Sequence, residues 1–128
     1  MELKLKTSKK DEVIDITEKI NKIIKEEELE DGICLVFIKH TTCAVTTCEL
    51  TDDVKHDLSS FLRAIVPGIE FRHEGIHSSD HILSSIIGPS VSVPVKDDKL
   101  SLGTWQKVVL VELNGPRERT IELSFIES

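Results

Sequence analysis

Short strand-like runs, each broken by polar or turn-forming residues, limit what this chain can fold into more than any other feature of its sequence. Residues 32–39 (GICLVFIK) and 43–48 (CAVTTC) are rich in β-branched or small residues, which is typical of buried strands. Asn114-Gly115 predicts a hairpin between the last two strands of the chain. Further strands are expected at residues 2–6, 90–95, 100–102, 107–113 and 119–126.

Segments with helical spacing lie between these strands. Apolar residues from Ile14 to Leu29 recur at helical intervals, and Asp31-Gly32 is expected to end that helix. A second helix is capped at Thr51 and stopped at Pro67-Gly68, and a short third helix runs from about Ser79 to Ile87. Helices interleaved with strands that close on an antiparallel run predict an α+β fold, with the helices packed against a sheet.

Length and composition exclude several classes of protein. A chain of 128 residues is the size of one domain, so we expect a single domain over residues 1–128. A net charge of −7 and only five aromatic residues (four Phe, one Trp) argue against nucleic acid as a partner. The longest apolar run, Ile33 to Ile38, is far too short for a membrane span. With no secretory signal and no disulfide framework among its three cysteines, the chain is expected to be cytoplasmic.

Histidines are the first candidates for chemistry. His73, His77 and His81 recur at every fourth residue, and His40 follows a predicted strand. On a helix, His77 and His81 would share a face and reach one metal ion, and a third imidazole would complete a catalytic zinc site. Because Gly75 favours a loop there, the alternative is a set of solvent-exposed loop histidines.

A thiol and two carboxylates are further candidates. Cys43 stands three residues after His40, which fits a cysteine nucleophile, although a small packed core residue is the alternative. Glu49 at the end of a strand and Asp57 early in a helix would each orient an imidazole or act as a general base. The alternative for both acids is simple exposure to solvent.

Residues for binding a ligand occur in the last quarter of the chain. Trp105 and Gln106 at a strand entrance would wall a ligand pocket, unless Trp105 is a core residue. Arg117 and Arg119 would hold a phosphate or a carboxylate. Surface pairing of these arginines with Glu118 or Glu122 is the alternative.

Seven motifs in this order resemble the YjbQ-like family, which is also labelled secondary thiamine-phosphate synthase. The resemblance covers essentially the whole chain and departs from the family pattern at Cys48, Phe71, His77 and Asp98. The motifs are HTTCAVTTCE (40–49), DDVKHD (52–57), FRH (71–73), SDHILSSIIG (79–88), VPV (93–95), LGTWQ (102–106) and NGPRERT (114–120).

This resemblance implies a barrel-like, mostly antiparallel β-sheet with two or three helices packed on it, usually assembled as a homotrimer. It also implies a divalent metal, expected to be zinc, on His40, His73 and His81; no family role carries over to His77. The remaining implied site residues are Glu49, Asp57, Trp105, Gln106, Arg117 and Arg119.

Three functional hypotheses follow. The first is a metal-dependent enzyme that acts on a small phosphorylated or carboxylated metabolite, with the weak thiamine-phosphate synthase activity that the family label implies. The second is a non-catalytic trimer that binds a metabolite or a metal. The third, a purely structural domain, leaves unexplained why polar motifs gather at the ends of strands.

Overall fold

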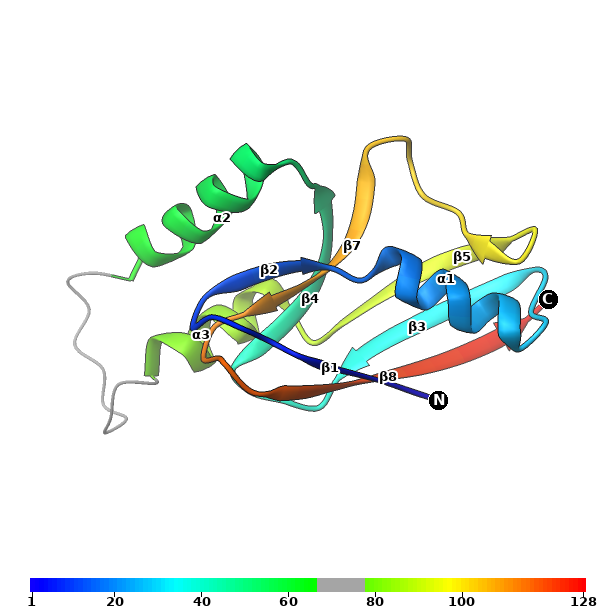
Figure 1. Ribbon diagram of the computed structural model, residues 1–128, viewed down its shortest axis with the longest axis horizontal. Coiled ribbons are helices and arrows are strands. Elements are labelled where there is room, and N and C mark those ends of the chain that lie inside the picture. Colours follow the sequence, from blue (N-terminus) through cyan, green and yellow to red (C-terminus); the bar gives the residue numbers. More distant parts are fainter. Residues whose placement is uncertain (67–77) are drawn as a thin grey trace.

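The computed structural model describes residues 1–66 and 78–128 (Figure 1). Within them the elements follow one another in the order β1 (Glu2–Lys6), β2 (Glu12–Asp15), α1 (Thr17–Glu26), β3 (Gly32–Ile38), β4 (Cys43–Glu49), α2 (Asp52–Ala64), α3 (Ser78–Ile87), β5 (Ser90–Lys96), β6 (Lys99–Leu100), β7 (Gln106–Glu112) and β8 (Glu118–Glu127).

The strands form two curled antiparallel sheets, which confirms the expected α+β class and the barrel-like, mostly antiparallel sheet. The larger sheet has the strand order β1-β8-β3-β5-β6, and the smaller has the order β2-β7-β4. Every pairing within both sheets is antiparallel. The chain passes from one sheet to the other several times, so residues distant in sequence meet at the ends of the strands.

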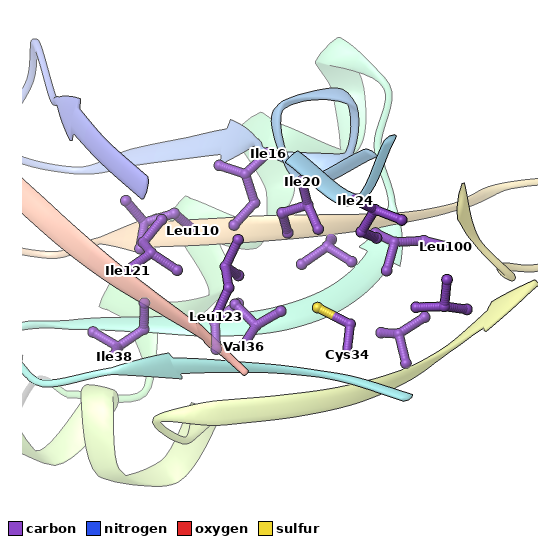
Figure 2. Packing of buried hydrophobic residues seen from close by; sticks show 14 of the residues in the cluster. Ile16, Ile20, Ile24, Cys34, Val36, Ile38, Leu100, Leu110, Ile121 and Leu123 are labelled. Atoms are coloured by element: carbon purple, nitrogen blue, oxygen red, sulfur yellow. The ribbon is translucent and has the colours of Figure 1, made fainter. Parts of the chain in front are cut away.

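The main core lies between the two sheets and is closed by α1. Ile16, Ile20 and Ile24 are fully buried and lie over β3, β7 and β8 (Figure 2). The spacing of four residues places these isoleucines on one face of α1, which explains why a helix with a polar opposite face packs here. In Figure 2, Leu100 lies at one end of this cluster and Ile121 at the other.

The smaller sheet is covered on its other face by α2 and α3. Val109 and Val111 of β7 pack with Leu62 of α2 and Leu83 of α3 in a second cluster. The neighbouring residues of β7 belong to the main core. Since successive side chains of a strand point to opposite faces, β7 is buried on both faces. This burial explains why its sequence is a continuous apolar run.

Two predictions about local structure are wrong. The first helix ends at Glu26 rather than at Asp31-Gly32, and Ile14 lies in β2, which pairs with β7. Asn114-Gly115 does not make a hairpin, because β7 and β8 belong to different sheets. Helical and strand periods both fit Ile14 and Ile16, and only the pairing with β7 separates them.

No helix in residues 1–66 or 78–128 has the length and apolarity that a membrane-spanning helix requires.

The Asp97-Asp98 turn is confirmed, since both residues have positive φ angles (51° and 59°) between β5 and β6. The expected helix stop at Pro67-Gly68 lies outside the described residues.

Candidate functional site

At one end of the main core, the inward-facing rows of several strands finish in polar residues. In β3 and β8 the row includes Ile38 and Ile121, which are direct partners in the ladder. Two residues further along each strand, on the same face, the side chain is polar instead of apolar. The residues at these positions are Glu112 in β7 and Arg119 in β8, with Thr7 and His40 just beyond the ends of β1 and β3.

Glu112 and Arg119 form a buried ion pair at this end. Arg119 donates from Nε to Oε2 of Glu112 (2.8 Å) and from Nη2 to Oε1. Arg119 Nη2 also donates to the hydroxyl (2.8 Å) and the carbonyl oxygen (3.1 Å) of Thr42. The two charged residues are only 0% and 1% exposed, so the pairing with Glu118 or Glu122 considered for Arg119 is wrong.

Glu112 accepts further hydrogen bonds that fix its charge. Its carboxylate accepts the hydroxyl of Thr7 (2.8 Å) and the backbone N–H groups of Leu113 (3.1 Å) and Asn114 (3.0 Å). Burial acts to raise the pKa of Glu112, but the hydrogen bonds from Arg119, Asn114 and Thr7 outweigh it and hold the pKa below its ordinary value. The pair is therefore charged at neutral pH.

The loop between β7 and β8 carries Arg117 to the same place. Arg117 Nε donates to the carbonyl oxygen of Asn114 (2.9 Å), and its backbone N–H donates to the hydroxyl of Thr7 (3.0 Å). In return, the backbone N–H of Thr7 donates to the carbonyl oxygen of Arg117 (3.0 Å). Arg117 is exposed, and the hydrogen bond of its guanidinium to the described residues is made through Nε, not through the terminal nitrogens.

His40 enters the site as a neutral imidazole. Burial, and next the positive charge of Arg119, lower the pKa of His40 below its ordinary value. The backbone N–H of Thr120 donates to Nε2 of His40 (3.2 Å). Since Nε2 is the acceptor, the proton of the neutral ring is carried by Nδ1, which makes His40 a hydrogen-bond donor through that nitrogen.

His81 joins the site from α3. Its Nδ1 lies 3.1 Å from the carbonyl oxygen of Thr41, which assigns a ring proton to Nδ1. The helix itself is held in place by the preceding residue, because the buried Asp80 accepts a hydrogen bond from Arg63 Nη1 of α2 (2.8 Å). Asp80 therefore has a structural role here.

These residues line a cavity of about 420 Å³. Its charged and titratable lining is basic throughout the described residues, although the chain as a whole carries a net charge of −7. A second cavity of about 570 Å³ shares His40, Thr41 and His81 with it. The lining residues of the first are Lys39, His40, Thr41, Thr42, His81, Asn114, Arg117 and Arg119.

Other predicted site residues lie at the opposite end of the smaller sheet. Glu49 pairs with Gln106, whereas Cys43 at the other end of β4 pairs with Glu112. Because a strand rises about 3.3 Å per residue, roughly 20 Å separates Glu49 from Cys43 along β4. Gln106 accepts the N–H of Gly103 (2.8 Å), and Trp105 is 71% exposed. Within one chain, these residues do not meet the basic cavity.

The remaining candidates are also separate from the cavity or outside the description. Asp57 lies on the exposed surface of α2, where its carboxylate is 3.6 Å from His56. His73 and His77 fall outside the described residues. Cys43 is fully buried, and burial raises the pKa of its thiol to about 11, so the structure favours a packed core residue over a nucleophile.

The described residues hold no complete metal site. Nowhere in the described stretches do three His, Cys, Asp or Glu side chains stand together as ligands would. His81 fits a zinc ligand, because such histidines donate their other ring N–H to a carbonyl oxygen. His40 as placed does not fit, since Thr120 occupies the lone pair of Nε2 and Nδ1 carries the proton.

Sequence reasoning missed Glu112, Thr7 and Thr42. The sequence did carry a signal for these residues, because each inward-facing row of side chains that is apolar along its strand ends in a polar residue. A buried carboxylate at the end of β7 needs a partner of opposite charge, and the next arginines along the chain are Arg117 and Arg119.

The comparisons with known proteins extend over the full chain. Residues 1–128 match the sequence model of the family described as UPF0047 protein YjbQ-like. A UPF0047 protein of Methanocaldococcus jannaschii is 40% identical over 124 residues, covering 95% of this chain and 90% of that protein. The UPF0047 protein YugU of Bacillus subtilis is 37% identical over 121 residues, which cover 92% of each chain.

Solved structures agree with the sequence relatives. A YjbQ/UPF0047 family protein from Clostridium acetobutylicum has a TM-score of 0.92 at 36% identity, and the match covers 98% of this chain and 99% of that one. A protein from Aeropyrum pernix K1 has a TM-score of 0.93 at 33% identity, covering 100% of this chain and 98% of that one.

Proposed function

This chain belongs to the YjbQ-like UPF0047 family, and from that premise we propose that its basic cavity binds the anionic group of a small phosphorylated or carboxylated metabolite as an enzyme substrate. The observation that carries the proposal is the concentration of basic side chains around one cavity of an acidic protein. Arginine supplies paired N–H donors that match phosphate and carboxylate oxygens.

Arg119 is prepared for this task by the bonds it already makes. Its Nε and Nη2 carry the hydrogen bonds that the structure gives it, all of them to Glu112 and Thr42. Nη1 is the guanidinium nitrogen left to meet an anion in the cavity that Arg119 lines. Because the guanidinium is already held, binding an anion would cost little side-chain entropy.

His40 gives the cavity a hydrogen-bond donor for the reacting group. A neutral imidazole with its proton on Nδ1 would donate a hydrogen bond from that nitrogen to a developing oxygen anion, and the proton would stay on the ring. The neighbouring arginine charge favours the neutral ring, which keeps this donor in place near neutral pH. We propose His40 as the group that stabilises this negative charge.

Titration calorimetry with inorganic phosphate tests the anion site. Arg117→Gln is expected to raise the phosphate Kd about tenfold, since a charge-assisted hydrogen bond is worth about 1.5–3 kcal/mol and 1.4 kcal/mol is tenfold. Lys4→Gln, which removes one charge from an exposed residue of β1, is the matched control and is expected to leave the Kd unchanged. Absence of phosphate binding in the unmodified chain would refute the proposal.

A zinc ion is a second candidate occupant of this region. The hydrogen bond between His81 and the carbonyl oxygen of Thr41 supports it. The other expected ligand, His73, lies outside the described residues. When bound, zinc would lower the pKa of a coordinated water to about 7. His40 would have to give up its bond from Thr120 to join, so the hydrogen bond proposed for its Nδ1 uses no metal.

Elemental analysis of protein purified without a histidine tag tests the zinc proposal. About one zinc per chain, lost in His81→Ala, is the expected result. Zinc retained in that variant would rule out His81 as a ligand. Absence of zinc after incubation with the ion would leave the histidines as hydrogen-bonding groups.

A homotrimer would account for the distance between the two groups of predicted residues. Glu49, Gln106 and the exposed Trp105 lie at the end of the smaller sheet away from the cavity. We propose that they would serve the cavity of a neighbouring subunit, with Glu49 as a general base. Measurement of the mass in solution tests this arrangement, and a monomer would eliminate it.

The reaction implied by the family resemblance is compatible with this chemistry. Thiamine-phosphate synthase joins a pyrimidine diphosphate to a thiazole phosphate, and both reactants carry the anionic group that the cavity would bind. Product formation that is lost in His40→Gln would support catalysis. Phosphate binding without turnover on any phosphorylated substrate tried would favour the non-catalytic binding protein instead.

A further inference from the structure

Glu112 does not line the basic cavity, yet its carboxylate is connected to both arginines of the cavity. The direct route is the pair of hydrogen bonds from Arg119. These bonds set the plane of the guanidinium, because two parallel donors bind two oxygens of one carboxylate. Arg119 cannot rotate without breaking both of them.

Arg117 is connected to the same carboxylate by two relays. In the first, Glu112 Oε1 accepts the backbone N–H of Asn114, whose carbonyl oxygen accepts Nε of Arg117. In the second, Glu112 Oε2 accepts the hydroxyl of Thr7, which in turn accepts the backbone N–H of Arg117. One buried carboxylate therefore orders both the loop after β7 and the side chain that leaves it.

We infer that Glu112 is a positioning residue for anion binding, acting through Arg119 directly and through Arg117 by way of Thr7 and Asn114. This inference rests on the proposed function. It assigns to Glu112 a role that opposes its simple electrostatic effect, since a negative charge beside the cavity repels an anion. The benefit is geometric, because a held pair of arginines meets the anion without reorganising.

The opposition of these two effects gives an experiment with a clear sign. Glu112→Gln removes the negative charge and replaces one acceptor oxygen by an amide that faces arginine donors. If the charge alone matters, the phosphate Kd falls. If positioning matters, the Kd rises despite the more positive cavity, and we expect an increase of about tenfold, equivalent to about 1.4 kcal/mol.

A double-mutant cycle separates positioning from general weakening of the fold. In an Arg117→Gln background, the Glu112→Gln effect on the phosphate Kd is expected to shrink, because one of the arginines that Glu112 positions is absent. Full additivity of the two effects, or an unchanged or lower Kd in Glu112→Gln, would overturn the inference. The melting curve of each variant establishes that it is folded at the temperature of the titration.

Thr7→Val keeps the inference testable where Glu112→Gln fails to fold. This variant cuts the relay through the hydroxyl and leaves the Glu112–Arg119 pair intact. It is expected to weaken phosphate binding in the unmodified chain and to have no further effect in Arg117→Gln. An equal effect in both backgrounds would contradict the relay. Failure of the unmodified chain to bind phosphate, by contrast, would refute the proposed function itself.

Discussion

Removing one partner of the buried ion pair should destabilise the fold strongly. In Arg119→Met, the carboxylate of Glu112 keeps its bonds from Thr7 and from two backbone N–H groups but loses the guanidinium. Because Glu112 is 0% exposed, no solvent replaces the lost charge. Breaking a buried pair in this way costs about 3–5 kcal/mol, which is the loss in unfolding free energy that we expect at pH 7.

The pH dependence of this loss makes the prediction specific. In the unmodified chain the pKa of Glu112 lies below its ordinary value, so its stabilisation is complete above the pKa of the unfolded chain and is lost as the pH falls from there through the folded-state pKa. In the variant, burial is no longer outweighed and the pKa of Glu112 should rise above the value of the unfolded chain. Protonation then favours the folded variant, and the difference from the unmodified chain should narrow between pH 7 and pH 5.

Urea denaturation followed by circular dichroism, at one protein concentration and at both pH values, measures these differences. Lys39→Met is the matched control, because it breaks the exposed ion pair of Lys39 with Glu122 (2.9 Å) and should change stability far less. A loss below about 1 kcal/mol in Arg119→Met would refute the reasoning on the buried pair. A difference that stays constant or widens at pH 5 would refute the reasoning on its charge.

Further predictions concern titration, thiol reactivity and packing. Because burial and Arg119 lower the pKa of His40, the folded chain binds fewer protons than the unfolded one below about pH 6.5, and stability should fall there; His40→Gln should flatten that slope in urea titrations. Iodoacetamide at pH 8 should label only Cys48 in the native chain, since burial raises the pKa of Cys34 to about 12 and of Cys43 to about 11; mass spectrometry of native labelling at either buried cysteine would contradict this. Ile20→Ala should cost about 2–5 kcal/mol of unfolding free energy, and a loss below about 1 kcal/mol would contradict the packing of α1.

The sequence allowed the strands and helices to be located well, because their patterns are local. The run from Ile33 to Ile38 and the turn at Asp97-Asp98 both appear where composition and turn chemistry predicted them. The assignment of strands to sheets is not local. Asn114-Gly115 carries a hairpin signal, yet β7 and β8 diverge to different sheets because both faces of β7 need partners.

The sequence predicted the candidate site only in part, again because the pairing of strands is not a local property. His40, His81 and the two arginines meet at one cavity, although their spacing in sequence gives no direct sign of it. Their meeting depends on the antiparallel pairing of β3 with β8 and on the docking of α3 beside β4. Glu112 was not predicted, because an acid at the end of an apolar strand resembles an ordinary solvent-exposed strand end. Its partner, Arg119, is identified only when β8 is placed beside it.

A crystal of the protein grown with tungstate locates the proposed anion site most directly, because this phosphate-like anion is identified by its anomalous scattering. The prediction is a tungstate ion in the cavity beside Arg117 and Arg119, with lower occupancy in crystals of Arg117→Gln grown at the same tungstate concentration. Tungstate bound only elsewhere on the protein, with this cavity empty, would contradict the proposal that these basic residues form an anion-binding site.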